Sequence, residues 1–221
     1  MTILFVLLTF LVVMLITHLT RRNIKPLYDE APIVASPSLP RMTRDLGFDI
    51  PQGYTFHPGH TWVVDEGRQN ARIGVDSFAA NLIGPIEKLE IAGLNRWVRQ
   101  GQKIITAKIG DTSVDMVAPV EGVVIAVNPE IARDPSIVQK DSYKEGWVCM
   151  IKSPDLKTNL KNLISGNFVA PWMQNSVSAV NGIANAGATA ADGGVPITGL
   201  LLKLTPEQQR VLIKEVFLTE Q

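Results

Sequence analysis

The sequence contains a single cysteine and three histidines among its 221 residues. One cysteine, Cys149, excludes a disulfide within the chain and a cysteine-rich zinc or iron–sulfur site. Charged residues make up only 19% of the chain, and 21 basic side chains balance 21 acidic ones. A nucleic-acid-binding protein would carry a basic excess or a basic face. The mean hydropathy of +0.14 is high for a soluble protein. The composition therefore predicts a membrane-attached protein without a metal.

Sequence motifs of common enzyme sites are also missing. The chain has no glycine-rich phosphate loop and no G-x-S-x-G nucleophile elbow. His57 and His60 form an H-x-x-H pattern, but the Pro-Gly pair between them breaks a helix, so we expect no metal site there. Cys149 falls in a predicted strand, residues 147–151, where an apolar environment favours a buried and unreactive thiol. We expect that the protein is not an enzyme.

The first twenty residues contain no Lys, Arg, Asp or Glu. A membrane-spanning helix needs about 20 mostly apolar residues. A cleavable signal peptide would have a positive start and a small-residue cleavage site, and this segment has neither. Residues 1–20 are therefore predicted to be a retained single-span anchor. Arg21, Arg22 and Lys25 follow the run, so the positive-inside rule places the N-terminus outside and the rest of the chain on the cytoplasmic side of the inner membrane.

Residues 21–51 are rich in proline, which removes backbone donors and favours extended conformations. We interpret this segment as a semi-rigid spacer, either a passive tether or a strap that lies along a partner. From residue 52 to residue 166, short β-branched runs alternate with turn residues, as in a small barrel or sandwich. Residues 61–64, 71–75, 103–109 and 122–127 are predicted strands. Residues 77–83 and 153–163 are predicted short helices, and residues 128–139 are predicted to be a short helix or a turn.

This β-rich region resembles the glycine cleavage system H protein, a relative of lipoyl domains. The resemblance is carried, in order, by HTWV at residues 60–63, DSFA at 76–79, LIG at 82–84, APVEG at 118–122 and KEGW at 144–147. It implies a mainly β fold, a flattened β-barrel of two sheets with short helices at one end. It also implies a lysine at the tip of a β-hairpin, whose ε-amine carries lipoate through an amide.

The residue in the position of that lysine is Asp111, when the segment from Gly101 to Gly122 is aligned without a gap. Aspartate cannot form the lipoyl amide, and Gly110-Asp111 is ordinary turn chemistry. Lys108 is the nearest lysine, three positions earlier and about 10 Å from the tip at about 3.3 Å per residue. Modification of Lys108 would need a change of strand register. We therefore expect that the fold is retained and that the cofactor is lost.

Residues 167–221 form the fourth predicted region, an extended arm that ends in a helix. Residues 176–194 are rich in Ala, Gly, Ser and Asn, which is typical of a flexible linker. Thr205, Pro206 and Gln208 then provide a helix start with a capping box, and the helix is predicted to end near Leu218. This helix either packs back on the β domain or inserts into a groove of a partner, and we favour the partner. The candidate partner-binding residues are Val211, Leu212, Val216, Phe217 and Trp97.

Two functions from different classes follow. The favoured one is a non-enzymatic, single-span accessory subunit that stabilises a larger energy-transducing membrane complex, a photosynthetic reaction centre or a respiratory complex, from the cytoplasmic side. Its partners would be the membrane and integral-membrane subunits of that complex. The alternative is a membrane-tethered lipoyl-type carrier that serves a dehydrogenase and is modified on a displaced lysine, with Lys108 as the candidate.

Overall fold

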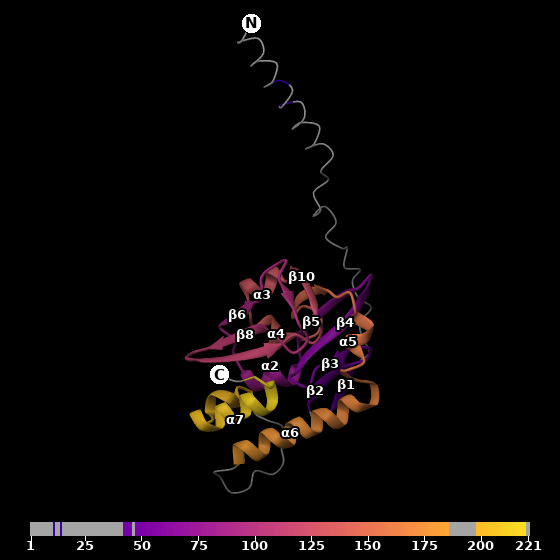
Figure 1. The fold of residues 1–221 in the computed structure, drawn as a ribbon. Helices are drawn as coiled ribbons and strands as arrows, with labels where there is room; N and C mark the ends of the chain where they lie inside the picture. The colour runs from indigo at the N-terminus through magenta and orange to yellow at the C-terminus, as the bar shows by residue number, and fades with distance from the viewer. Residues whose placement is uncertain (1–10, 12–13, 15–41, 46, 186–197, 220–221) are drawn as a thin grey trace. The chain divides into compact units, whose positions relative to one another are not determined.

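The computed structural model describes residues 11, 14, 42–45, 47–185 and 198–219. The chain divides into two compact units, Met1–Leu39 and Pro40–Gln221, and the fold below is that of the second (Figure 1). The predicted anchor and most of the predicted spacer lie outside the described residues, so both stay predictions. In the part of the chain that is described, no helix combines the length and the apolar character needed to cross a membrane.

The second unit is mainly β, as the sequence predicted. Its strands are β1 (Met42–Asp45), β2 (Phe48–Pro51), β3 (Thr55–Phe56), β4 (Thr61–Gly67), β5 (Asn70–Val75), β6 (Lys88–Ile91), β7 (Trp97–Val98), β8 (Lys103–Ile109), β9 (Thr112–Val117), β10 (Gly122–Val127), β11 (Trp147–Lys152) and β12 (Ile164–Ser165). Its helices are α2 (Ser77–Ile83), α3 (Pro129–Arg133), α4 (Ile137–Lys140), α5 (Leu156–Leu160), η1 (Gly166–Phe168), α6 (Val169–Asn185), η2 (Leu200–Lys203) and α7 (Pro206–Phe217).

The strands form a seven-stranded sheet in the order β12-β3-β4-β5-β11-β10-β7, a three-stranded sheet β6-β8-β9, and the hairpin β1-β2. Every strand pair is antiparallel. The expected closed barrel is wrong: among the described strands, the two larger sheets are not joined by a strand pair. The strands at the two ends of the large sheet, β7 and β12, have only two residues each, which is too short to continue the hydrogen bonding into a ring.

Local sequence signals explain α2, which the sequence located at its observed bounds. Asp76 is the N-cap, and its carboxylate accepts a hydrogen bond from the backbone N–H of Ala79 at 2.8 Å. Gly84 ends the helix with φ +86, a backbone conformation that favours glycine. The apolar face of α2 is buried, because Phe78, Leu82 and Ile83 belong to the main hydrophobic core.

Two segments differ from the sequence-based expectation. The predicted spacer ends before Met42, because Met42–Asp45 and Phe48–Pro51 pair as the strands β1 and β2, with Phe48 and Ile50 buried. The predicted extended arm, residues 167–221, instead contains the long helix α6, which includes residues 176–185 of the predicted linker. Met173, Val177 and Val180 follow one another at helical spacing and are buried, so the helix is stabilised by tertiary packing rather than by propensity.

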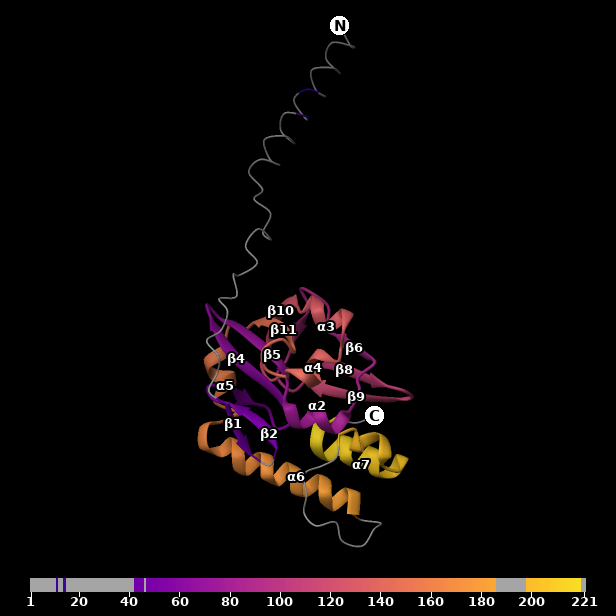
Figure 2. The same ribbon diagram turned by 180° about the vertical axis from the view of Figure 1, so that it is seen from behind.

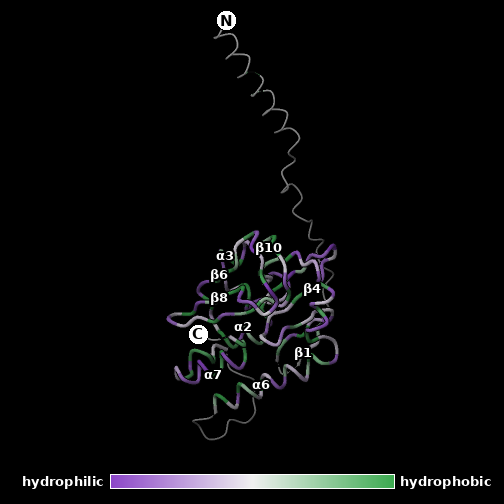
Figure 3. The backbone as a smooth tube through the Cα atoms, viewed as in Figure 1, coloured by the Kyte–Doolittle hydropathy of each residue, from purple (hydrophilic) through white to green (hydrophobic). Residues whose placement is uncertain are grey.

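The C-terminal helix packs on the body of this unit. Figures 1 and 2 show α6 and α7 side by side beneath the sheets, with α7 next to the hairpin formed by β8 and β9. Along α7, hydrophobic and hydrophilic stretches alternate (Figure 3). Leu212, Val216 and Phe217 are buried. Just beyond the helix, the Thr219 hydroxyl donates to the Asp115 carbonyl of β9 at 3.0 Å.

Candidate functional site

The β8-β9 hairpin projects from the body of the second unit, as two views of the ribbon show (Figures 1 and 2). Ile109 pairs with Thr112, so Gly110 and Asp111 form a two-residue loop at the tip. Gly110 has φ +55, which glycine adopts without strain. Asp111 is exposed. Gly110 and Asp111, which the sequence predicted to form this turn, therefore lie where a partner protein can reach them.

Lys108 lies on the outer face of the three-stranded sheet, close to the tip. Its direct cross-strand partner on β6 is Lys88, and on β9 it is Ser113. The Lys108 Nζ lies 2.8 Å from Glu90 Oε1, and the Lys88 Nζ lies 3.0 Å from the same oxygen. Hydrogen bonds from the Lys108 and Lys88 ammonium groups hold the pKa of Glu90 below its ordinary value. One carboxylate thus bridges two lysines.

A lipoyl group does not fit the tip position, since the Asp111 carboxylate offers no amine for an amide bond. It does fit Lys108, whose side chain is 45% exposed and ends in a primary amine. Acylation would neutralise that amine and release it from Glu90. Glu90 would still keep its partner Lys88, so no carboxylate would be left without a counter-ion. The sequence identified Lys108 as a candidate. It could not identify Glu90 and Lys88 as its neighbours, because their proximity depends on the register between β6 and β8.

A second polar cluster, which the sequence did not predict, lies between β4, α2 and α6. His60 Nδ1 lies 2.7 Å from Asp76 Oδ2, and His60 Nε2 lies 3.1 Å from Ser176 Oγ. The contacts run from Asp76 to His60 to Ser176, which is the order of side chains in an Asp-His-Ser catalytic triad. The imidazole, however, is 1% exposed and lies between the rings of Phe78 and Trp172, each at a centroid distance of 4.6 Å.

Ser176 is also a poor nucleophile in this setting. Its hydroxyl hydrogen-bonds the Trp172 carbonyl at 3.2 Å, one turn earlier in α6. The backbone N–H groups in the middle of a helix are already used within it, so none is available to stabilise an oxyanion. We conclude that the His60 cluster fastens α6 to the β domain and is structural.

The other sequence candidates, His57 and Cys149, do not lie on the β8-β9 hairpin. His57 Nδ1 accepts a hydrogen bond from the Gly59 N–H at 3.0 Å, and burial lowers the pKa of His57, with the neighbouring His60 adding to the effect. Cys149 is fully buried in β11, and burial raises the pKa of its thiol. Within the described ranges, no group of three His, Cys, Asp or Glu side chains is placed to hold a metal ion.

The five predicted partner-binding residues fall into two groups. Leu212, Val216 and Phe217 are taken up by the protein's own core, because α7 packs on the body. Val211 and Trp97 are 40% and 47% exposed. Binding of a partner by any of the five residues stays a prediction.

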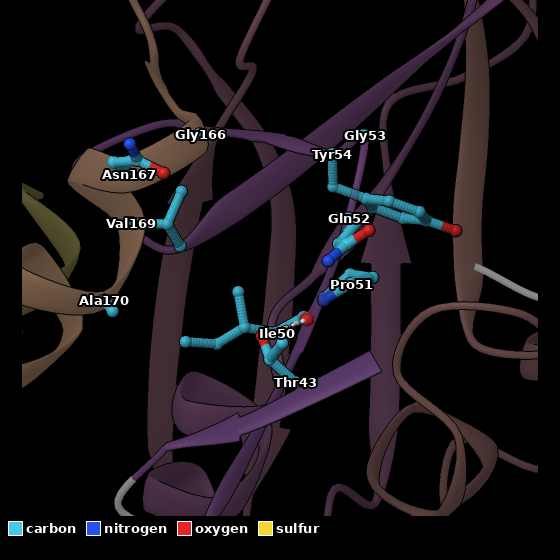
Figure 4. Close-up of a pocket in the computed structure, with 10 residues that line it drawn as sticks. All are labelled: Thr43, Ile50, Pro51, Gln52, Gly53, Tyr54, Gly166, Asn167, Val169 and Ala170. Atoms are coloured by element: carbon cyan, nitrogen blue, oxygen red, sulfur yellow. Dashed lines mark hydrogen bonds between the residues drawn. The ribbon is translucent and has the colours of Figure 1, made fainter. Parts of the chain in front are cut away.

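A pocket of about 550 Å³ lies between the β1-β2 hairpin and the start of α6. Figure 4 shows the residues that line it. Its walls include Ile50, Tyr54 and Val169, and the carboxamides of Gln52 and Asn167 come from separate segments of the chain. None of the ten residues that line it is charged. The pocket borders an aromatic cluster that contains Tyr54, Phe56, Trp62 and Tyr143, and no residue of the β8-β9 hairpin lines it.

The β domain has relatives among known proteins. A family model described as "Glycine cleavage H-protein" matches residues 54–176. The chain is 31% identical over 119 residues to the glycine cleavage system H protein of Idiomarina loihiensis, covering 54% of this chain and 92% of the relative. It is 29% identical over 108 residues to the H protein of Thermus thermophilus, covering 49% of this chain and 84% of the relative. A crystal structure of the H protein of Mycobacterium marinum aligns with a TM-score of 0.49 at 19% identity, over 57% of this chain and 98% of that one.

These similarities correct the favoured function from the sequence. Both relatives are named glycine cleavage system H proteins, and the family match spans the β domain from β3 to β12. The prediction of a structural subunit of a photosynthetic or respiratory complex is therefore wrong. It gave too much weight to one residue, Asp111, and to segments outside the β domain.

Proposed function

This chain belongs to the glycine cleavage H-protein family, and we propose that it is a non-enzymatic carrier that presents the β8-β9 hairpin to partner enzymes, with Lys108 as the lysine that bears the acyl group. The observation that carries this proposal is the Lys108 amine, which is half exposed beside the hairpin tip and shares Glu90 with a second lysine. A lipoyl amide at this amine would supply a swinging arm between the active sites of the partners.

The residues of this chain have defined roles in the proposal. The three-stranded sheet holds Lys108 on a regular strand, and the ion pair with Glu90 keeps the amine close to the surface before modification. Lys88 holds Glu90 afterwards. We further propose that residues 1–20 anchor the carrier in the inner membrane, with its β domain on the cytoplasmic side, and that it serves a dehydrogenase. The uncharged run and the basic residues that follow it support this part.

The presence of Asp111 at the tip favours a second candidate, a module that presents the hairpin to a partner enzyme without carrying an acyl group. In this case the hairpin would serve for recognition alone. The two candidates differ in one property, the covalent state of Lys108.

Intact-mass measurement of the full chain, produced in lipoate-supplied cells with a lipoate-attaching enzyme, tests the proposal. We expect one lipoyl adduct, lost in Lys108→Arg and kept in the matched control Lys88→Arg. Asp111→Lys, which places a lysine at the tip, is the positive control for recognition of the hairpin. An adduct on Asp111→Lys but none on the parent chain would establish the second candidate. An adduct that disappears only in Lys88→Arg would assign the modification to the neighbouring lysine and refute Lys108.

A further inference from the structure

An exposed surface surrounds β7, the edge strand of the seven-stranded sheet. Trp97 is 47% exposed and Leu94, in the loop before it, is 55% exposed. Trp97 pairs with Val123 of β10, and Val123 pairs with Lys152 of β11. Direct cross-strand partners share a face of the sheet. Trp97, half-buried Val123 and exposed Lys152 therefore form one row on the outer face.

Three basic side chains belong to this row or lie next to it in the sequence. Arg96 and Arg99 flank Trp97 in sequence and are exposed, as is Lys152. In the described part of the chain, none of these three cations belongs to an ion pair, although Lys88, Lys103, Lys108, Lys140 and four arginines do. The pairing of Val98 with Gly122 brings half-buried Glu121 opposite Arg99, and no ion pair joins them. We call this surface the β7 patch, and its residues are Leu94, Arg96, Trp97, Arg99, Val123 and Lys152.

The chemistry of the β7 patch suits an extended anionic surface. It lies on the face of a sheet, and three pockets of the second unit are lined by other residues. Tryptophan side chains favour the boundary between lipid headgroups and acyl chains, because the ring is amphipathic. Each Lys or Arg near an anionic leaflet strengthens binding about fivefold. Three cations outside any ion pair around an exposed tryptophan meet both requirements.

We propose that the β7 patch docks on an anionic phospholipid bilayer, with Trp97 at the headgroup boundary and Arg96, Arg99 and Lys152 against lipid phosphates. The choice of a bilayer over an acidic protein rests on the proposed anchor in residues 1–20. A chain tethered to a membrane meets it at a high effective concentration, so a patch with weak intrinsic affinity is sufficient. Docking would fix the orientation of the hairpin relative to the membrane.

Vesicle binding by residues 40–221, the second compact unit, tests the patch without the anchor. The probes are vesicles of phosphatidylcholine alone and vesicles with about one third phosphatidylglycerol. We expect sedimentation with the anionic vesicles only, and release at high salt because exposed charges are screened. The triple reversal Arg96→Glu, Arg99→Glu and Lys152→Glu is expected to weaken binding at least ~100-fold, since three contributions of about fivefold are removed and then opposed.

The matched control reverses Arg133, Lys140 and Arg210, which are also exposed but lie on α3, α4 and α7. It changes the net charge equally and should bind as the parent does. Trp97→Ala should weaken binding without changing its salt dependence. All these positions are exposed, and a circular dichroism spectrum equal to that of the parent verifies the fold of each variant.

If the control reversal weakened vesicle binding as much as the patch reversal does, net charge alone would explain the loss of binding, and the proposal would be overturned. Binding to a soluble poly-glutamate but not to anionic vesicles would assign the patch to an acidic protein and also overturn it. Lys108→Ala should bind vesicles normally. Failure of vesicle binding with a normal lipoyl adduct, or the reverse, therefore separates this inference from the proposed function.

Discussion

His60 Nδ1 lies 2.7 Å from Asp76 Oδ2, and both side chains are almost fully excluded from solvent. The pair links α2 to α6, because Asp76 caps α2 while His60 contacts Ser176 of α6. A buried carboxylate that loses its partner is strongly destabilising. The first turn of α2 and the attachment of α6 thus depend on one buried interaction.

His60→Ala should therefore lower the free energy of unfolding by about 3–5 kcal/mol, as expected when one member of a buried pair is removed. Ser176→Ala removes a single hydrogen bond at the edge of the cluster and should cost about 1 kcal/mol. Urea denaturation followed by circular dichroism measures both. If the two substitutions cost the same, His60 contributes only its contact with Ser176 and the Asp76 pair adds nothing.

The bridging carboxylate predicts a measurable change at Glu90 on modification of Lys108. The pKa of Glu90 is held low by hydrogen bonds from Lys108 and Lys88. Lys108→Ala, or acylation of the amine, should raise this pKa, while Lys88 keeps it below the ordinary value. A titration of the Glu90 carboxyl by NMR detects the shift. Arg133→Ala, on another element, is the control that should leave Glu90 unchanged.

His57 predicts the direction of a pH effect. Burial lowers the pKa of its imidazole in the folded state below the ordinary 6.5. The unfolded chain therefore binds a proton at a higher pH than the folded protein does, and the free energy of unfolding rises with pH through this range. Stability due to His57 is present above its unfolded pKa and falls as the pH drops towards its folded pKa. Urea unfolding of the parent and His57→Gln between about pH 5 and pH 8 should show a shallower dependence in the variant.

Cys149 should be inert in the folded protein. It is fully buried in β11, and burial raises the pKa of the thiol, so very little thiolate forms near neutral pH. A thiol-specific reagent should label the native protein only as fast as the strand opens, and should label it quickly in urea. Fast labelling without denaturant would show that the β11 region opens locally.

The sequence was most informative where local signals and burial agree. The Asp76 cap, the apolar face and Gly84 together define α2, and Thr205 with Gln208 defines the start of α7 through a capping box. The strands β5, β8 and β10 were recognised from short β-branched runs with turn residues at their ends. In these elements, a few neighbouring residues are enough to specify the structure.

The sequence was least informative where distant segments determine the outcome. Residues 176–185, the second half of α6, were taken for part of a linker because their small residues hide the helical spacing of Val177 and Val180, which becomes meaningful only against the core. The Lys108–Glu90 contact depends on strand register, and the His60–Ser176 contact spans 116 positions of the chain. Site residues that come from one segment could be predicted, whereas their partners from other segments could not.

The family match ends at residue 176, in the middle of α6. A domain cut at that point would lose Val177 and Val180, which complete the inner face of the helix, together with α7. The residues after 176 are therefore part of the same folded unit. A domain that ends at residue 176 would expose to water the apolar surface that these residues cover. A fusion protein or a minimal scaffold built from this domain has to contain the chain as far as the end of α7, at Phe217.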